Sequence, residues 1–153
     1  MQPKRILSLF LTCSLASAGE LTTEVYDSET SKRLGGDHFL ALQWISWKNY
    51  GVAKIRTSEN EQWTLEGQQL GADGDFLKLK GVITEVRENR FLFSGAIITK
   101  VSHIAGGKEV KRAGLFNFLQ TGTRKYWRMQ EMQNPEDDVI DYVDIFFLKY
   151  SNH

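Results

Sequence analysis

Residues 76–101 read FLKLKGVITEVRENRFLFSGAIITKV, and this stretch decides the fold class. Apolar and polar side chains alternate on both sides of Glu88-Asn89. This pattern is typical of two strands joined by a tight turn, because successive side chains on a strand point to opposite faces. A two-residue turn at this position places Val86 opposite Phe91. The stretch therefore predicts a β-hairpin.

The first strand of this hairpin keeps a single apolar face only if it carries a bulge. Leu77 and Leu79 are out of phase with Val82 and Val86, since the alternation has a period of two. Glycine is a usual bulge residue, so we predict the bulge at Gly81. The core face of the hairpin is then predicted to hold Leu77, Leu79, Val82, Val86, Phe91, Phe93 and Ile97.

Similar alternating runs lie on both sides of the hairpin, separated by Gly, Asn, Asp or Ser residues. No long window shows the helical period of apolar residues. Together the runs give eight strand candidates, at residues 39–47, 50–56, 62–67, 76–86, 91–104, 110–119, 125–132 and 139–148. They predict an all-β fold, either an eight-stranded antiparallel barrel or a barrel-like sandwich.

The first residues have the pattern of a secretory signal peptide. Lys4 and Arg5 precede the apolar run 6–15, and a small-residue cleavage site follows at 16–18. An apolar helix of that length spans about half of a bilayer core, so we expect no stable membrane span. Cys13 leaves a lipoprotein signal as an alternative. The pattern predicts an exported protein, periplasmic or secreted.

The rest of the chain divides into two parts. Residues 19–36 are mostly polar, and we expect a loosely docked N-terminal arm with at most one short strand. Residues 37–153 are expected to form a single β domain that follows the signal peptide, residues 1–18. No linker or low-complexity segment separates a second domain.

Composition excludes several classes of function. The 153 residues include 19 basic and 19 acidic side chains, so the formal net charge is zero. Such a balance offers no electrostatic attraction to nucleic acid or to an anionic membrane. A single cysteine excludes an internal disulfide framework and a multi-cysteine zinc site.

The segment 123–130 offers the most specific candidate site. On a strand, Arg124, Tyr126 and Arg128 share one face, which forms a row of donors with an aromatic ring between them. Trp127 and Met129 share the other face, which is predicted to face the core. Such a row can line a pocket and hold an anionic head group or a sugar. It can equally be a solvated outer face on which Arg128 pairs with Asp141 or Asp144.

His103 is the fourth candidate site residue. It falls on the same strand face as Phe91 and Phe93, beside a pair of glycines. A titratable ring at the end of an apolar face can contact a ligand or act as a general base. The alternative is a strand-end histidine whose ring nitrogens meet backbone groups or water.

Motifs for other chemistry are absent from the sequence. It contains no Gly-x-Ser-x-Gly, P-loop, His-Glu-x-x-His or Gly-x-Gly-x-x-Gly pattern. The acidic run 134–144 lacks the spacing of an EF-hand. We therefore predict no cofactor and no metal site, and an enzyme, which would have to use His103 and an aspartate, is the least supported reading.

Two resemblances accompany these patterns. Residues 122–147 and 90–112 resemble small exported bacterial proteins of uncharacterised function, a likeness that implies no activity. The strand number and chain length also resemble the lipocalin-like (calycin) barrels, although Leu42-Gln43 precede Trp44 where that family has Gly-x-Trp. A shared fold does not establish ligand binding.

These observations predict an exported, non-enzymatic β-barrel that binds a small anionic or amphipathic ligand through Arg124, Tyr126, Arg128 and His103. The alternative is a protein-binding module, an inhibitor or envelope-associated adaptor, that acts through loops and an exposed Trp44 or Trp47. A polar-lined pocket of roughly several hundred Å³ would favour the binding of a small ligand. A filled barrel with an exposed apolar patch would favour the protein-binding module.

Overall fold

The computed structural model describes residues 22–149, so the predicted signal peptide, residues 1–18, lies outside the described residues. Within that range the chain forms one α-helix, α1 (Ser28–Leu34), two short 3-10 helices, η1 (Ala72–Gly74) and η2 (Ala105–Gly107), and nine strands. These are β1 (Glu24–Val25), β2 (Gly36–Leu42), β3 (Gly51–Thr57), β4 (Trp63–Leu70), β5 (Phe76–Arg87), β6 (Arg90–Lys100), β7 (Glu109–Leu119), β8 (Tyr126–Met129) and β9 (Val143–Lys149). All eight predicted strands are present.

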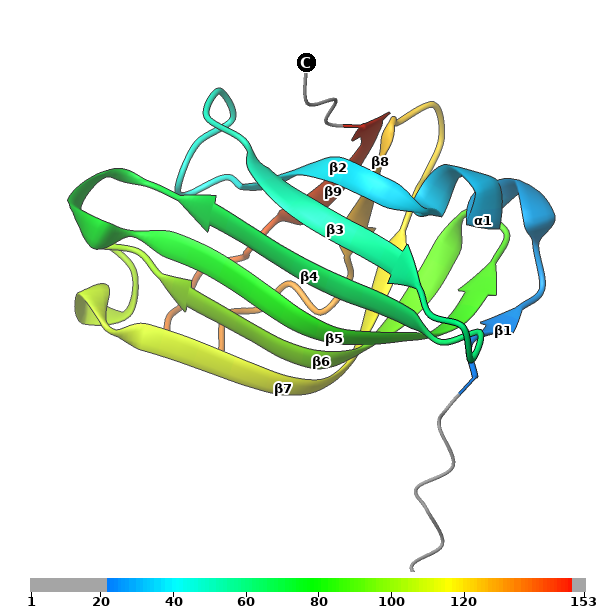
Figure 1. The fold of residues 1–153 in the computed structure, drawn as a ribbon. Coiled ribbons are helices and arrows are strands. Elements are labelled where there is room, and N and C mark those ends of the chain that lie inside the picture. Colours follow the sequence, from blue (N-terminus) through cyan, green and yellow to red (C-terminus); the bar gives the residue numbers. More distant parts are fainter. Residues whose placement is uncertain (1–21, 150–153) are drawn as a thin grey trace, which may run out of the picture.

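The strands β2 to β9 close into an antiparallel barrel (Figure 1). Each strand pairs with the next along the chain, and β9 pairs with β2 to complete the circuit. The closed barrel is therefore confirmed over the sandwich. Closure leaves fewer open strand edges than a sandwich would, which limits aggregation.

The hairpin turn forms as the sequence predicts. Val86 pairs with Phe91, and Arg87 pairs with Arg90 across the turn. Asn89 takes the left-handed conformation with φ 59°. Asparagine tolerates that conformation better than most residues, because its short polar side chain can hydrogen-bond locally.

The bulge of β5 lies further along the strand than predicted. The register of β5 against β6 shifts between Ile83 and Glu85, not at Gly81. Ile83 therefore faces the core and is fully buried, whereas Val82, predicted to face the core, lies on the outer face. The shift coincides with a change of neighbour, since β4 pairs with β5 as far as Ile83 and β1 takes over from Glu85.

Glycine permits the strong bend of the long strands. Gly81, Gly95 and Gly114 lie side by side on β5, β6 and β7, which curve around the barrel (Figure 1). The ring of Phe93 occupies the space that side chains at Gly81 and Gly95 would need, whereas Gly114 has open space there but a positive φ of 145°. A Cβ at Gly95 would lie 2.7 Å from Phe93 Cζ and 2.8 Å from Gly81 Cα. Glycine is thus required at this corner of the sheet.

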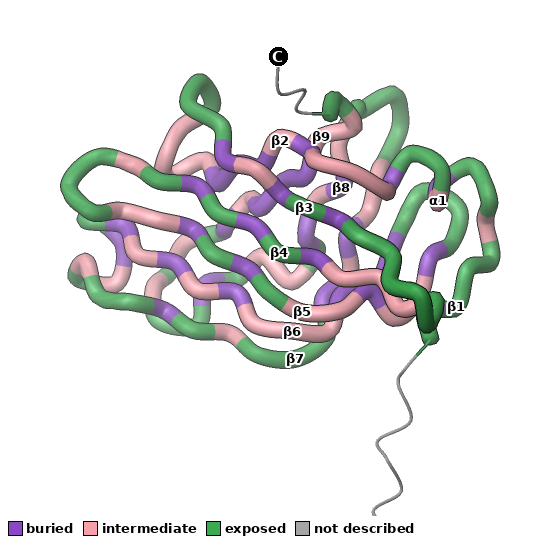
Figure 2. The backbone as a smooth tube through the Cα atoms, in the orientation of Figure 1, coloured by how far each residue is buried: buried purple, intermediate pink, exposed green. Residues whose placement is uncertain are grey.

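Aromatic rings fill the middle of the barrel. Phe91 and Phe118 stack with their centroids 4.9 Å apart, and Trp127 meets Phe91 edge-on at 5.8 Å. All three are buried, as is Met129, the neighbour on β8 that the sequence also places in the core. Figure 2 shows how buried and exposed residues alternate along β4 and β5 around this filling.

The N-terminal segment differs from the loosely docked arm that the sequence predicts. It carries β1, the one short strand expected, but also α1, which was not predicted. Asp27 caps this helix by accepting the Thr30 N–H at 2.8 Å, and the Thr30 hydroxyl accepts the Asn89 N–H at 3.0 Å. Thr30 and Leu34 are buried against the barrel. The helix has no apolar stripe in its sequence, because Leu34 is its only apolar residue.

We expect Gly95→Ala to lower the free energy of unfolding by about 2 kcal/mol, because the new methyl group overlaps Phe93 and the neighbouring strand. Gly35→Ala is the matched control, since a Cβ there meets no atom within 4 Å and φ is −66°. Its effect should stay within about 0.5 kcal/mol. Urea unfolding followed by tryptophan fluorescence measures both, and equal stability of the two variants would contradict the role of the glycine corner.

Candidate functional site

Side chains cover both ends of the packed barrel. Leu34 of α1 lies over one end and is fully buried. At the other end the connection from β8 to β9 is held by the buried carboxylate of Asp141. This carboxylate accepts hydrogen bonds from Arg112 Nη2 at 2.5 Å, Asn134 Nδ2 at 3.0 Å and Trp44 Nε1 at 3.0 Å. The hollows described below lie on the outer surface of this packed barrel.

A groove of about 710 Å³ runs over the outer wall of the barrel from β3 to β6. We call it the β3–β6 groove. This volume lies within the range of about 300–1,000 Å³ that is common for small-molecule sites. The groove is lined mainly by outward-facing side chains, because Leu77 and Leu79 point into the core and turn their neighbours outward. The outward set is Val52, Lys54, Glu66, Gln68, Lys78, Lys80, Ala96 and Ile98.

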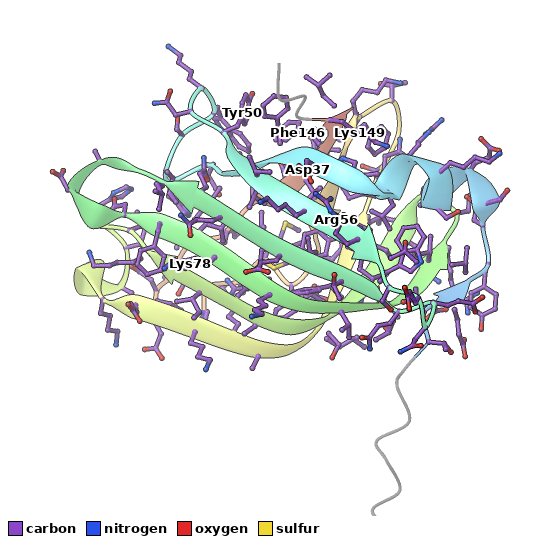
Figure 3. The ribbon with its side chains drawn as sticks, in the orientation of Figure 1. Asp37, Tyr50, Arg56, Lys78, Phe146 and Lys149 are labelled. Atoms are coloured by element: carbon purple, nitrogen blue, oxygen red, sulfur yellow. The ribbon has the colours of Figure 1, made fainter. Side chains whose placement is uncertain are left out.

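The β3–β6 groove combines positive charge with an apolar surface. It holds three lysines and one glutamate, so its formal charge is 3 − 1 = +2 in a chain with no net charge. In the register of the sheet Glu66 lies opposite Lys54 on β3 and Lys80 on β5, without a salt bridge to either within residues 22–149. Lys78 projects from β5 with its Nζ 4.7 Å from the centre of the Phe76 ring (Figure 3). Such a surface suits a molecule with an anionic head and an apolar body.

The predicted row on β8 lies on the outer wall as well. Arg128 donates two hydrogen bonds to the carboxylate of Asp144, at 2.7 and 2.8 Å, and its guanidinium lies 3.9 Å from the Tyr142 ring centre. Burial raises the pKa of Asp144, against the opposing effect of Arg128, and the hydrogen bonds to Asp144 raise the pKa of Arg128. Arg128 is therefore paired with Asp144, one of the two partners that the sequence suggests.

The other two members of the row, Arg124 and Tyr126, lie beside Arg128. Arg124 is exposed, with its guanidinium 5.9 Å from the Tyr126 ring centre, and Arg128 lies 5.0 Å from the same ring. The charge of Arg128 is balanced by Asp144. Arg124 is thus the residue of the row that offers its charge to solvent, and the role of the row in ligand binding stays a prediction.

An aromatic row extends from Tyr126 across the outer wall. Tyr126 and Phe146 have their ring centres 5.6 Å apart, and Phe146 and Tyr50 have theirs 5.2 Å apart. Tyr50 in turn lies 5.4 Å from Phe39. Figure 3 shows Tyr50 and Phe146 near each other at the upper edge of the barrel. The row is a half-exposed apolar strip rather than a hollow.

His103 does not lie in the row with the arginines. It is exposed on the connection from β6 to β7, with its ring 5.9 Å from that of Trp44. An enzyme would need His103 beside one aspartate, Asp141 or Asp144, and these carboxylates pair with Arg112 and Arg128 respectively. The structure thus brings together three of the four predicted site residues.

The two neighbouring tryptophans do not belong to a regular strand, because β2 ends at Leu42. Trp44 packs partly against the core and donates its indole N–H to Asp141. Trp47 is 43% exposed. Of the two, Trp47 is the one that a partner can reach.

His38 is fully buried where α1 meets the barrel wall. Its Nδ1 lies 2.7 Å from the Phe146 carbonyl oxygen and its Nε2 lies 2.7 Å from that of Leu34. Burial lowers the pKa of His38 below the usual 6.5, although the two carbonyls act in the opposite direction. A neutral ring has one N–H and donates to one of these carbonyls. His38 therefore has a structural role that joins α1 to β9.

Among residues 22–149, no group of three or more His, Cys, Asp or Glu side chains is arranged to hold a metal ion. The helix in the same part of the chain is too short to cross a membrane.

Sequence reasoning missed the lysines of the β3–β6 groove. Their alternation with Leu77 and Leu79 was visible, and it marked Lys78 and Lys80 as outward-facing. An outward lysine on a strand is normally only a solvated side chain. The curvature of the sheet, which brings lysines from β3 and β5 around one hollow, is not encoded in local alternation.

Comparison with known proteins relates the whole barrel to one family. Residues 22–147 match the PM1083 family. The chain is 39% identical over 142 residues to the uncharacterised protein PM1083 of Pasteurella multocida strain Pm70, and the alignment covers 93% of this chain and 92% of that protein. No solved structure matches the chain.

We expect Asp141→Asn to lower the free energy of unfolding by about 3 kcal/mol, because it leaves the Arg112 guanidinium buried without a counter-charge. Arg112 and Asp141 are only 11% and 3% exposed at their side chains. Glu136→Gln is the matched control, since Glu136 pairs with Lys108 in the open and such pairs contribute about 0–1 kcal/mol. Chemical unfolding measures the difference, and a similar effect of both variants would disprove the account.

We expect the stability of the protein to fall as the pH drops below 6.5, the usual pKa of histidine. The lowered pKa of His38 means that the unfolded chain takes up the proton first, so protonation favours unfolding. The contribution of neutral His38 to the free energy of unfolding is complete above the pKa of histidine in the unfolded chain. It is lost as the pH falls towards the lower pKa of His38 in the folded protein. Thermal unfolding across this range should show a smaller fall of melting temperature with pH for His38→Gln than for the parent protein. An equal fall in both proteins would contradict the role of His38.

Proposed function

The chain belongs to the PM1083 family, whose match spans the barrel, and we propose that it is an exported, non-enzymatic protein that binds a small anionic, amphipathic molecule in the β3–β6 groove. The observation that carries the proposal is the groove itself, with three lysines around an apolar surface on the outside of a packed barrel. The signal-peptide pattern of residues 1–18 supports export.

Charge and shape both favour this class of ligand. Within residues 22–149 no salt bridge engages Lys54, Lys78 or Lys80, so their ammonium groups remain available to a carboxylate, phosphate or sulfate. Val52, Ala96 and Ile98 supply an apolar surface beside them. The head of the ligand would meet the lysines, and its body would cover the apolar side chains.

The aromatic row supports a second candidate, a protein-binding module. Tyr50 is 43% exposed and is in ring contact with Phe39 and Phe146. Exposed tyrosines are enriched at protein interfaces. A filled barrel that carries an exposed apolar strip also favours protein binding. The groove is the stronger candidate for a small ligand, because the charge of Arg128 beside the row is already balanced.

Titration calorimetry with decanoate, below its micelle concentration, tests the proposal. Lys78→Ala combined with Lys80→Ala should weaken binding by about fivefold to tenfold, since an exposed charge pair contributes up to about 1 kcal/mol. Added salt should also weaken binding of decanoate to the parent protein, because it screens the attraction between the carboxylate and the lysines. Decanol, which has the same chain without the charge, should bind more weakly.

Two variants locate the site. Lys32→Ala removes an exposed lysine of α1, outside the groove, and should leave decanoate binding unchanged. Arg124→Ala tests the row on β8. If this variant loses binding while the double lysine variant keeps it, the ligand occupies the row and the assignment to the groove is wrong.

A further inference from the structure

The strand β7 has a partner along only part of its second edge. It pairs with β6 over its whole length, but it pairs with β8 only at Phe118 and Leu119. The preceding part, from Lys111 to Leu115, therefore borders no strand on that side among the described residues, 22–149. Its outward residues are accessible, and Leu115 is 55% exposed. This part is named the open edge of β7.

The backbone groups of the open edge point away from β6 at alternate residues. Asn117 shows the direction, because its carbonyl accepts the Gln130 N–H at 2.7 Å and its own N–H donates to the Glu131 carboxylate at 2.9 Å. The register of β7 against β6 is unbroken, so Lys111, Ala113 and Leu115 present their N–H and carbonyl groups on the same side as Asn117.

At Asn117 the Glu131 carboxylate takes the place of a partner strand. Within residues 22–149 no backbone group forms a hydrogen bond on this side with the N–H or carbonyl groups of Lys111, Ala113 or Leu115. Natural proteins usually cover such an edge or interrupt it, since unpaired groups on an edge are a template for another strand.

A hollow of about 450 Å³ lies next to the open edge. One wall is β7, with Arg112 and Phe116, and the opposite wall is the connection from β8 to β9, with Met132 and Ile140. Ile140 is 49% exposed although it is apolar. The hollow thus offers apolar contacts beside a row of backbone donors and acceptors.

This arrangement suits a single extended peptide better than a second barrel. The opposite wall belongs to the same chain, so the occupant must lie between β7 and the connection from β8 to β9. The open edge of another copy would bring its own β8–β9 connection into the same space. A flexible extended segment has no such obstacle, and its alternate side chains can meet Phe116 and Ile140.

We propose that the open edge of β7, from Lys111 to Leu115, accepts an added β-strand from an extended segment of another polypeptide, with apolar side chains at alternate positions. Binding of this kind takes its affinity from main-chain hydrogen bonds and its specificity from the side-chain hollow. The open edge is separate from the β3–β6 groove, and either site can exist without the other.

Hydrogen–deuterium exchange of the whole protein tests the proposal with a defined probe, a capped peptide of alternating threonine and valine about seven residues long. At roughly ten times its dissociation constant, the peptide should slow exchange at the Lys111, Ala113 and Leu115 amides by about tenfold. Unchanged exchange at these amides with millimolar peptide would overturn the proposal.

Ala113→Pro should abolish the protection at Lys111 and Leu115. Proline removes a donor that points to the open edge, and edge strands tolerate it there. Ala113→Ser is the matched control, because it keeps the backbone N–H and should bind like the parent protein. A peptide N-methylated at every second residue should also fail to bind, which tests the hydrogen bonds even if Ala113→Pro does not fold.

Sedimentation distinguishes the other occupant. The proposal expects a monomer at concentrations where the peptide binds. If the parent protein is a dimer and Ala113→Pro is a monomer, the open edge binds a second copy of this chain. That result would overturn the proposal of a peptide partner.

Discussion

Closure of the barrel depends on the antiparallel pairing of β2 with β9, which joins the N-terminal and C-terminal ends of the sheet. Leu40 pairs with Ile145, and Leu42 pairs with Val143, so four buried apolar side chains meet in the lumen at this seam. The pairing closes the sheet around these apolar faces. Since the inside is filled by large rings, the two binding sites that we propose lie on the outer wall and at the incomplete seam between β7 and β8.

That incomplete seam, between β7 and β8, is bridged by side chains in place of backbone hydrogen bonds. Arg112 reaches from β7 to Asp141, which also holds Trp44 and Asn134. A buried ion pair carries a large desolvation cost, so its main effect is to position the β8–β9 connection rather than to add stability. The same arrangement leaves part of β7 without a neighbour and places a hollow beside it. The Arg112–Asp141 ion pair and the open edge of β7 therefore both lie where β7 and β8 stop pairing.

The outer wall carries two surfaces with different chemistry. On β8 and β9 the charge of Arg128 is balanced by Asp144, and its guanidinium is covered by the Tyr142 ring. The aromatic row beside this ion pair therefore presents a mainly apolar surface. On β3 to β6 the lysines outnumber the carboxylate, and no ring covers Lys54 or Lys80 in the described part of the chain. The physical distinction is whether a charge is already paired. This distinction is why we propose the groove for an anionic ligand and keep the strip as the second candidate, a surface for a protein.

Alternation of side chains by itself determined the strands of this protein, the hairpin turn at Glu88-Asn89 and the burial of Trp127 and Met129, because these depend on neighbours along the chain. It also allowed Arg128 to be matched with Asp144, though it did not choose between Asp144 and Asp141. Only the tertiary structure decided the closed barrel, the bulge after Ile83, the docking of α1 and the groove around Lys78. Each of these depends on contacts between segments far apart in the sequence, such as β1 replacing β4 beside β5, and on the curvature of the sheet, for which a local pattern of polar and apolar residues has no signal.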